Sequence, residues 1–157
     1  MHLAPRTLTF AVENFDSMIE EFRPLAQRHW EEIALNRDTI PLDPDWEMYR
    51  RADAGGFLRC YSVRLNGALI GYSVFFLVPR HPHYNHRWAN NDIIRVAPEH
   101  RDGRVGLKLC LFAEQDLQKD GPIVVNYHTK IDHPALGRLL SAVGYGLIEH
   151  GYSKRLG

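Results

Sequence analysis

Apolar residues near the start of the chain recur at three- and four-residue intervals, which predicts a long amphipathic helix. We expect it over residues 15–36, with Asp16 as N-cap and Pro24 kinking or splitting it. The apolar stripe runs through Phe15, Met18, Ile19, Phe22, Leu25, Ala26, His29, Trp30 and Ile33. A second, short helix is predicted over residues 46–54, because Gly55 and Gly56 follow it.

Apolar runs separated by turn residues predict the strands. Asn66-Gly67, a strong signal for a two-residue hairpin turn, lies between predicted strands at residues 57–65 and 68–78. Further strands are expected at 8–12, 92–97, 122–127 and 145–154, further helices at 103–119 and 134–143, and a polar loop at 79–91. This order predicts an α/β (α+β) fold, with a mixed, partly antiparallel sheet flanked by helices.

Composition narrows the class of protein. The 157 residues suit one domain, residues 1–157, and 19 basic against 19 acidic residues give no general field for nucleic acid or an anionic membrane. No apolar run approaches a membrane span, and residues 1–15 lack the apolar core of a signal peptide. We therefore expect a cytoplasmic protein, with Cys60 and Cys110 as free thiols.

The three histidines of the polar loop could be interpreted as metal ligands. His81, His83 and His86 have suitable spacing, but no cysteine or acidic cluster near them completes a ligand set. We therefore expect no metal, and we interpret this loop, with Trp88, as lining the entrance for a substrate. The helix over residues 46–51 is expected to face the same cleft.

The stretch from residue 93 to residue 110 carries the main candidate chemistry. A strand stops at Pro98, and a helix begins near Gly103. The free N–H groups of a helix N-terminus can bind phosphate, and Arg101, Arg104 and Lys108 add positive charge beside them. The alternative is an ordinary tight turn with solvated arginines. The sequence has neither the GxxxxGK[ST] nor the GxGxxG pattern of nucleotide-binding loops.

Residues 96–106, V-A-P-E-H-R-D-G-R-V-G, resemble the acetyl-CoA-binding motif V-x-P-E-x-R-x-x-G-x-G of the GNAT superfamily of N-acyltransferases. The order of elements also resembles that family over almost the whole chain, and residues 140–145 resemble its closing Y-x-K-x-G-F pattern. The chain is similar, too, to small GNAT-like proteins of phage and prophage genomes. The resemblance implies the GNAT fold and, since such proteins often pair through late strands, a possible homodimer.

The resemblance also implies which residues hold acetyl-CoA. The side chains and amides of the turn would bind the pyrophosphate: Arg101, Asp102, Gly103, Arg104, Val105 and Gly106. The backbone of Val96 and Ala97 would pair with the pantetheine arm. Three positions depart from the family pattern: Arg104 replaces the first glycine of GxG, Leu140 replaces a tyrosine that protonates the leaving thiolate, and His133 replaces an asparagine near the pantetheine.

Acyl transfer to an amine needs a base and a proton for the departing thiolate. Asp92 is the leading base candidate, acting through water, and its alternative role is to cap a turn. His128 is a second candidate, because histidine is a common general base, but it could be an ordinary loop histidine. Tyr145 and Tyr152 could replace the missing acid or be packing aromatics.

We predict an acetyl-CoA-dependent N-acyltransferase acting on a small-molecule or protein amine. The alternatives are a catalytically inactive CoA-binding sensor and a phage-derived accessory protein.

Overall fold

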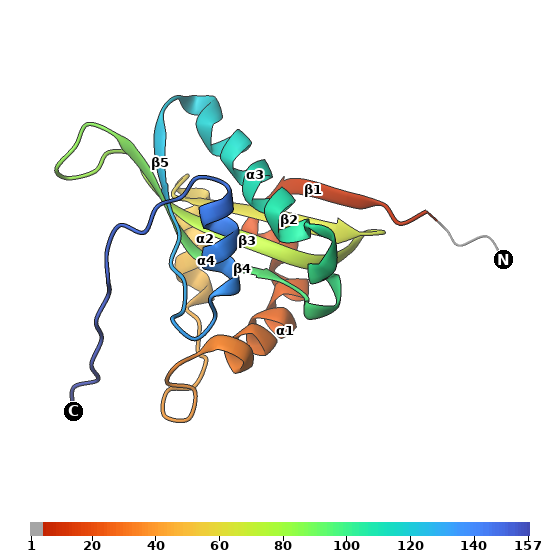
Figure 1. Cartoon of the computed structure of the whole chain (residues 1–157), viewed down its shortest axis with the longest axis horizontal. Coiled ribbons are helices and arrows are strands. Elements are labelled where there is room, and N and C mark those ends of the chain that lie inside the picture. Colours follow the sequence, from red (N-terminus) through yellow and green to blue (C-terminus); the bar gives the residue numbers. More distant parts are fainter. Residues whose placement is uncertain (1–4) are drawn as a thin grey trace.

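A five-stranded mixed sheet forms the centre of the computed structural model, which describes residues 5–157 (Figure 1). Its elements are β1 (Leu8–Glu13), α1 (Phe15–Ile33), α2 (Trp46–Ala54), β2 (Leu58–Leu65), β3 (Ala68–Val78), β4 (Arg87–Val96), the short helix η1 (Pro98–Gly103), α3 (Val105–Leu117), the short helix η2 (Gln118–Asp120), β5 (Ile123–Asn126) and α4 (Ala135–Ala142). The strands lie in sequence order. The first three pairs are antiparallel, and β4 and β5 are parallel. The predicted mixed α/β fold is confirmed.

Each face of the sheet carries its own apolar core. On one face, α1 and α2 cover a cluster that includes Met18, Phe22 and Tyr72. On the other face, α3 covers a cluster that includes Val63, Phe75 and Leu109. Figure 1 shows α3 and α1 on opposite sides of the sheet. Because β3 is central and covered on both faces, it is apolar almost throughout, as its sequence indicates.

The hairpin between β2 and β3 turns where the sequence predicts it. Asn66 and Gly67 have φ angles of 50° and 88°, and two consecutive left-handed residues are what a tight turn with the twist of the flanking strands requires. The polar loop is shorter than expected, since β4 already begins at Arg87.

The start and course of α1 differ from the prediction. The helix is continuous through Pro24, so the predicted split is wrong. Asp16 is not its N-cap: that position is Asn14, and the first free amide, Phe15 N–H, donates to Asp53 Oδ2 at 2.7 Å. Asp16 instead pairs with Arg50 at 2.7 Å. The carboxylate that satisfies this helix end therefore comes from α2, which no local pattern could indicate.

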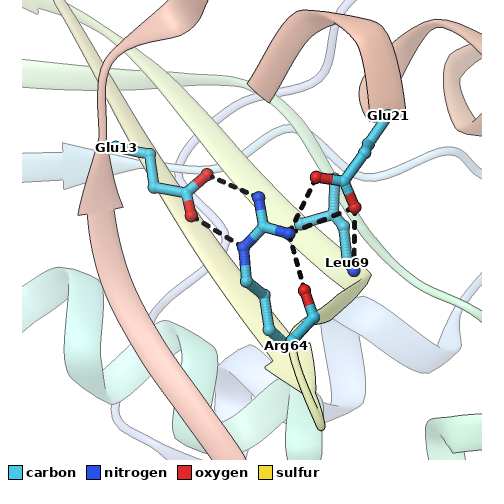
Figure 2. A network of polar contacts seen from close by, with 5 residues as sticks. Glu13, Glu21, Arg64 and Leu69 are labelled. Atoms are coloured by element: carbon cyan, nitrogen blue, oxygen red, sulfur yellow. Dashed lines mark hydrogen bonds and ion pairs between the residues drawn. The ribbon is translucent and has the colours of Figure 1, made fainter. Parts of the chain in front are cut away.

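A cluster of charged residues, the Arg64 cluster, fastens α1 and β1 to the hairpin (Figure 2). Arg64 on β2 binds Glu13 of β1 with two nitrogens, at 2.8 and 3.1 Å, and Glu21 of α1 at 2.8 Å. Glu21 also accepts the N–H of Leu69 at 3.3 Å. The Arg64 cluster thus joins two strands and a helix through one guanidinium.

The predicted last strand, over residues 145–154, is wrong. The chain there is neither strand nor helix, and Leu147, Ile148 and Tyr152 are exposed. Gly146 and Gly151 interrupt the stretch, and glycine weakens a strand because it adds conformational entropy without a side chain to pack. Among residues 5–157, no helix combines the length and apolar character needed to cross a bilayer.

Candidate functional site

The pairing of strand β4 with β5 ends at the point where its pairing with β3 is interrupted by a bulge. β5 pairs with it only from Arg87 to Asn90. On its other side, the register with β3 shifts so that Asp92 lies between the paired residues Asn91 and Ile93 without a partner of its own. Asp92 is therefore the extra residue of a β-bulge, a feature common beside active sites. From Asn91 onward, the edge of β4 that faces β5 is open.

The backbone groups that face this open edge can be identified from one hydrogen bond. Ala97 N–H donates to Ile70 O on β3 at 2.8 Å, and Ala97 O accepts from His100 N–H at 2.9 Å. Because orientation alternates along an antiparallel strand, Val96 and Ile94 face the open edge. The role predicted for Val96 fits this geometry. The pairing predicted for Ala97 does not, since both of its backbone groups are already bonded; Ile94 is the other residue here whose backbone groups face the open edge.

A cavity of about 550 Å³ follows the open edge. It lies between β4 and the segment 128–139, and residues of α1 and of the start of α3 complete its wall. Seven of the predicted site residues line it: Asp92, Val96, Arg101, Arg104, Gly106, His128 and His133. The geometry therefore brings together two candidate catalytic residues and most of the candidate CoA-binding residues, from segments up to 41 positions apart (92 to 133).

The remaining candidates lie elsewhere. Val105 is buried in the core beneath α3, so only its backbone amide can serve a ligand. Asp102 and Gly103 form the end of η1. Tyr145 lines a different cavity, of about 400 Å³, and packs edge-on against Tyr127 with ring centres 5.3 Å apart.

Tyr145, predicted as a possible replacement for the missing acid, therefore lies outside the cavity that Asp92 lines. Its neighbours in the smaller cavity include Glu114 of α3, so it faces the α3 side of the sheet. Burial, and then a hydrogen bond to Glu114, raise the pKa of the Tyr145 hydroxyl above its usual value. Tyr152 is exposed in the C-terminal segment.

The N-terminus of α3 opens onto the larger cavity without a cap of its own. Arg104 occupies the N-cap position and makes no side-chain cap bond, and the first amides of a helix have no acceptors within it. Arg104 has a φ of 60°, a left-handed conformation that favours glycine. This explains why glycine is expected at this position of the motif. A Cβ atom on Gly106 would lie 3.4 Å from Leu139 Cδ1, so the wall is close-packed there.

Arg101 lies across the open edge of β4 in this structure. Its Nε donates to Val96 O at 2.8 Å, and its Nη1 lies 2.7 Å from Glu32 Oε1 on α1. The bond to Arg101, more than any other contact, lowers the pKa of the Glu32 carboxyl. The carbonyl predicted to pair with pantetheine is thus already occupied by the arginine predicted to bind phosphate.

Two further hydrogen bonds reach the cavity from helices α1 and α2. Tyr49 of α2 donates its hydroxyl to Asp92 Oδ2 at 2.7 Å, as the expected position of that helix near the cleft suggests. Burial, and then the bond to Asp92, raise the pKa of Tyr49. Nδ1 of His29 on α1 lies 3.2 Å from the hydroxyl oxygen of Tyr72. Burial lowers the pKa of the His29 imidazole to about 4. Of these residues, sequence reasoning assigned Asp92 to the site, but no role to Tyr49, His29 or Tyr72.

The histidine loop does not reach this cavity. His81 packs against Trp88 with ring centres 4.4 Å apart, and His86 lines the smaller cavity beside Tyr145. The predicted role of this loop at the substrate entrance is therefore not met by the cavity that contains Asp92. Across the described part of the chain, no three His, Cys, Asp or Glu side chains are grouped so that they could hold a metal ion.

The fold matches solved acetyltransferase structures over nearly its full length. A ribosomal-protein-alanine N-acetyltransferase from Brucella melitensis has a TM-score of 0.70 at 19% identity, covering 96% of this chain and 100% of that one. A GCN5-related N-acetyltransferase from Ralstonia eutropha has a TM-score of 0.72 at 18% identity, with 96% and 100% covered. An aminoglycoside N-acetyltransferase in complex with CoA has a TM-score of 0.70 at 15% identity, with 99% of both chains covered. No protein-family model matches the sequence, and no curated protein matches it significantly.

Proposed function

We propose that this chain, which has the fold of the GCN5-related N-acetyltransferases, transfers an acetyl group from acetyl-CoA to a primary amine. One observation carries the proposal: the open edge of β4 and the uncapped N-terminus of α3 face the same cavity. A strand edge pairs with amide groups such as those of pantetheine, and a helix N-terminus binds phosphate. CoA contains both, joined in one molecule.

The cavity wall has charge that suits this ligand. Its cationic side chains are Arg95, Arg101, Arg104, Lys130 and Arg138, against the acidic Glu32, Asp92 and Asp132. The diphosphate would accept hydrogen bonds from the amides of residues 105–107 and from Arg104. The pantetheine would pair with Ile94 and Val96. For this pairing, Arg101 has to leave Val96 O and turn toward the phosphates.

Asp92 is the base in this proposal, because it lines the same cavity. The amine nitrogen attacks the thioester carbonyl carbon, a C–N bond forms, and the C–S bond breaks as the thiolate leaves with its electron pair. Asp92 takes the proton of the amine through water, while Tyr49 holds its carboxylate in place. Leu140 is buried and has no proton to give, so the candidate donors to the thiolate on the cavity wall are His128 and His133.

Two measurements on the purified protein test this function. Saturating acetyl-CoA should raise the melting temperature, since a ligand at 100 times its Kd adds about 2.7 kcal/mol to the free energy of unfolding. A panel of primary amines should then release thiol from acetyl-CoA. Asp92→Asn should lower kcat by about 10²–10⁴-fold at unchanged acetyl-CoA affinity, the range for loss of a general base. Absence of a thermal shift at millimolar acetyl-CoA would overturn the proposal.

Tyr49→Phe is the matched control for the role of Asp92. It removes one hydroxyl from the side chain that touches Asp92 and keeps the ring that stacks on Phe15, with centres 5.3 Å apart. We expect a smaller loss of kcat than in Asp92→Asn. A Tyr49→Phe variant that loses activity as fully as Asp92→Asn would transfer the leading role to the phenol.

A second function has its own support. Leu140 occupies the position of the usual acid, and Tyr145 lies outside the cavity. A protein that binds CoA without transferring its acyl group would have these properties. A thermal shift with acetyl-CoA, but no thiol release in wild type or in Leu140→Tyr, would favour this inactive CoA-binding form.

A further inference from the structure

Three charged residues at the α1 side of the cavity leave a surplus of positive charge. We call Arg95, Glu32 and Arg101 the Arg95 cluster. The single carboxylate of Glu32 faces two guanidinium groups: Arg101 Nη1 at 2.7 Å and Arg95 Nε at 3.4 Å. In this arrangement the cluster therefore has a net charge of about +1, on side chains of which only that of Arg95 is buried.

Arg95 is the buried member of the cluster. Its side chain is only 6% exposed, yet it lines the cavity. Within residues 5–157 its one hydrogen-bond partner is Glu32, through Nε, so the two terminal nitrogens have no partner. Neither of these nitrogens is fully buried, so both are accessible from the cavity. An arginine that presents its planar terminal fork unbonded is suited to a carboxylate or phosphate.

His29 adds a donor at the same place. Tyr72 is fully buried, and we assign its hydroxyl as the donor to His29 Nδ1, because its proton has no other acceptor in the described structure. In a neutral imidazole the proton then resides on Nε2. His29 borders the cavity, and its burial, followed by the charge of Arg95, disfavours a charged ring, while the carboxylate of Glu32 acts in the opposite direction. It therefore supplies a hydrogen-bond donor and no charge.

The position of Arg95 on the sheet indicates which molecule brings the anion. Arg95 contacts Glu32 of α1, and Asp92 contacts Tyr49 of α2, so both side chains project on the face that α1 and α2 cover. The phosphates of CoA belong at the start of α3, which packs on the opposite face. An amine that reaches Asp92 lies on the same face of the sheet as Arg95. Asp92 and Arg95 are about 10 Å apart along the strand.

We propose that Arg95, with His29, binds a carboxylate of the acceptor, which makes the acceptor a small amine of the amino-acid class. The proposal rests on the proposed function, since it assigns the second substrate of the same site. Polyamines and aminosugars, which lack a carboxylate, would leave the terminal nitrogens of Arg95 unbonded and would bind weakly.

Matched probes that differ only in a carboxylate test this assignment. In protein with ¹⁵N-labelled arginine, the Arg95 Nε–H signal is identified by its loss in Arg95→Lys. L-lysine and L-ornithine should move this signal, in free and CoA-saturated protein, at concentrations at which cadaverine and putrescine do not. Where turnover is measurable, kcat/KM should favour each amino acid over its decarboxylated partner at least tenfold. Arg95→Gln should abolish this preference, and Arg95→Lys should keep part of it.

Arg28→Gln is the control, because Arg28 is an exposed residue of α1 that does not line the cavity. It should preserve both the signal shift and the preference. The proposal is overturned if the diamines move the Arg95 signal as strongly as the amino acids do, or if neither does. It is also overturned if Arg95→Gln weakens acetyl-CoA binding more than threefold, since the anion would then be a phosphate of CoA. Acetyl-CoA binding with no preference for carboxylates would reject this inference alone and leave the proposed function standing.

Discussion

The Arg64 cluster and the Arg95 cluster contain the same types of residue in opposite proportions. In the first, one guanidinium is shared by two carboxylates, Glu13 and Glu21, and its Nη1 also donates to Gly67 O (Figure 2). In the second, one carboxylate is shared by two guanidinium groups. Every side-chain nitrogen of Arg64 has an acceptor. Of the side-chain nitrogens of Arg95, only Nε has one, Glu32 Oε2 at 3.4 Å.

The difference separates a structural contact from a binding surface. The Arg64 cluster is complete without a ligand and joins elements far apart in the sequence, so its role is stability. The Arg95 cluster is incomplete, lines a cavity and borders the edge where we place acetyl-CoA. The terminal nitrogens of Arg95 are accessible from the cavity and have no protein acceptor in the described structure, so a bound anion could accept hydrogen bonds from them.

The largest expected effect is a difference in the free energy of unfolding between variants of Arg64 and of Arg95. Arg64→Gln should lower the free energy of unfolding by about 3 kcal/mol, because it strands the largely buried carboxylate of Glu13 and removes the bond to the exposed Glu21. Arg95→Gln should change the same free energy by less than about 1 kcal/mol, since Glu32 keeps its bond to Arg101. Urea unfolding of the two variants measures both. Equal losses would mean that the Arg95 cluster is also a structural contact.

The second effect is a pH dependence from His29. Its folded-state pKa of about 4 lies below the usual 6.5, so the unfolded chain binds this proton more readily. The stabilisation is complete above pH 6.5 and is lost as the pH falls toward 4, by about 3 kcal/mol in all. His29→Gln should remove this part of the acid destabilisation.

The exposed His83 provides the control for that measurement. His83→Gln should unfold with the pH dependence of the wild type. Urea unfolding at several pH values between 4 and 7 compares the three proteins. A His29→Gln profile parallel to that of the wild type would show that His29 is not held neutral.

The smallest effect concerns the backbone of Arg104. Its φ of 60° costs a non-glycine residue about 1 kcal/mol, so Arg104→Gly should raise the free energy of unfolding by about that amount. Arg104→Ala keeps the strain and should not stabilise. Both variants lose the same charge and should weaken acetyl-CoA binding alike at low salt, by calorimetry. A stabilised alanine variant would contradict the strain.

Local signals in the sequence predicted the parts of the fold that depend on local chemistry. The bounds of α2 and β3 agree with the prediction, because Gly55-Gly56 and Asn66-Gly67 end or reverse the chain whatever surrounds them. The strand expected over residues 145–154 depends on a neighbouring strand to accept its hydrogen bonds, and that dependence has no local signal.

The site was predictable in its backbone and not in its contacts. The motif around Gly106 placed the helix N-terminus correctly, because turns and helix starts are local. The pairs Arg101–Glu32, Tyr49–Asp92 and Tyr72–His29 join residues 43 or more positions apart and depend on how helices lie on the sheet. The predicted cytoplasmic location, homodimer and likeness to phage proteins stay predictions.

The most direct test of the account is a crystal structure of the protein soaked with acetyl-CoA. We expect the diphosphate on the amides at the start of α3, the pantetheine paired with Ile94 and Val96, and the Arg101 side chain released from Val96 O. Acetyl-CoA bound elsewhere, or an unchanged bond of 2.8 Å between Arg101 and Val96 with an empty cavity, would contradict it.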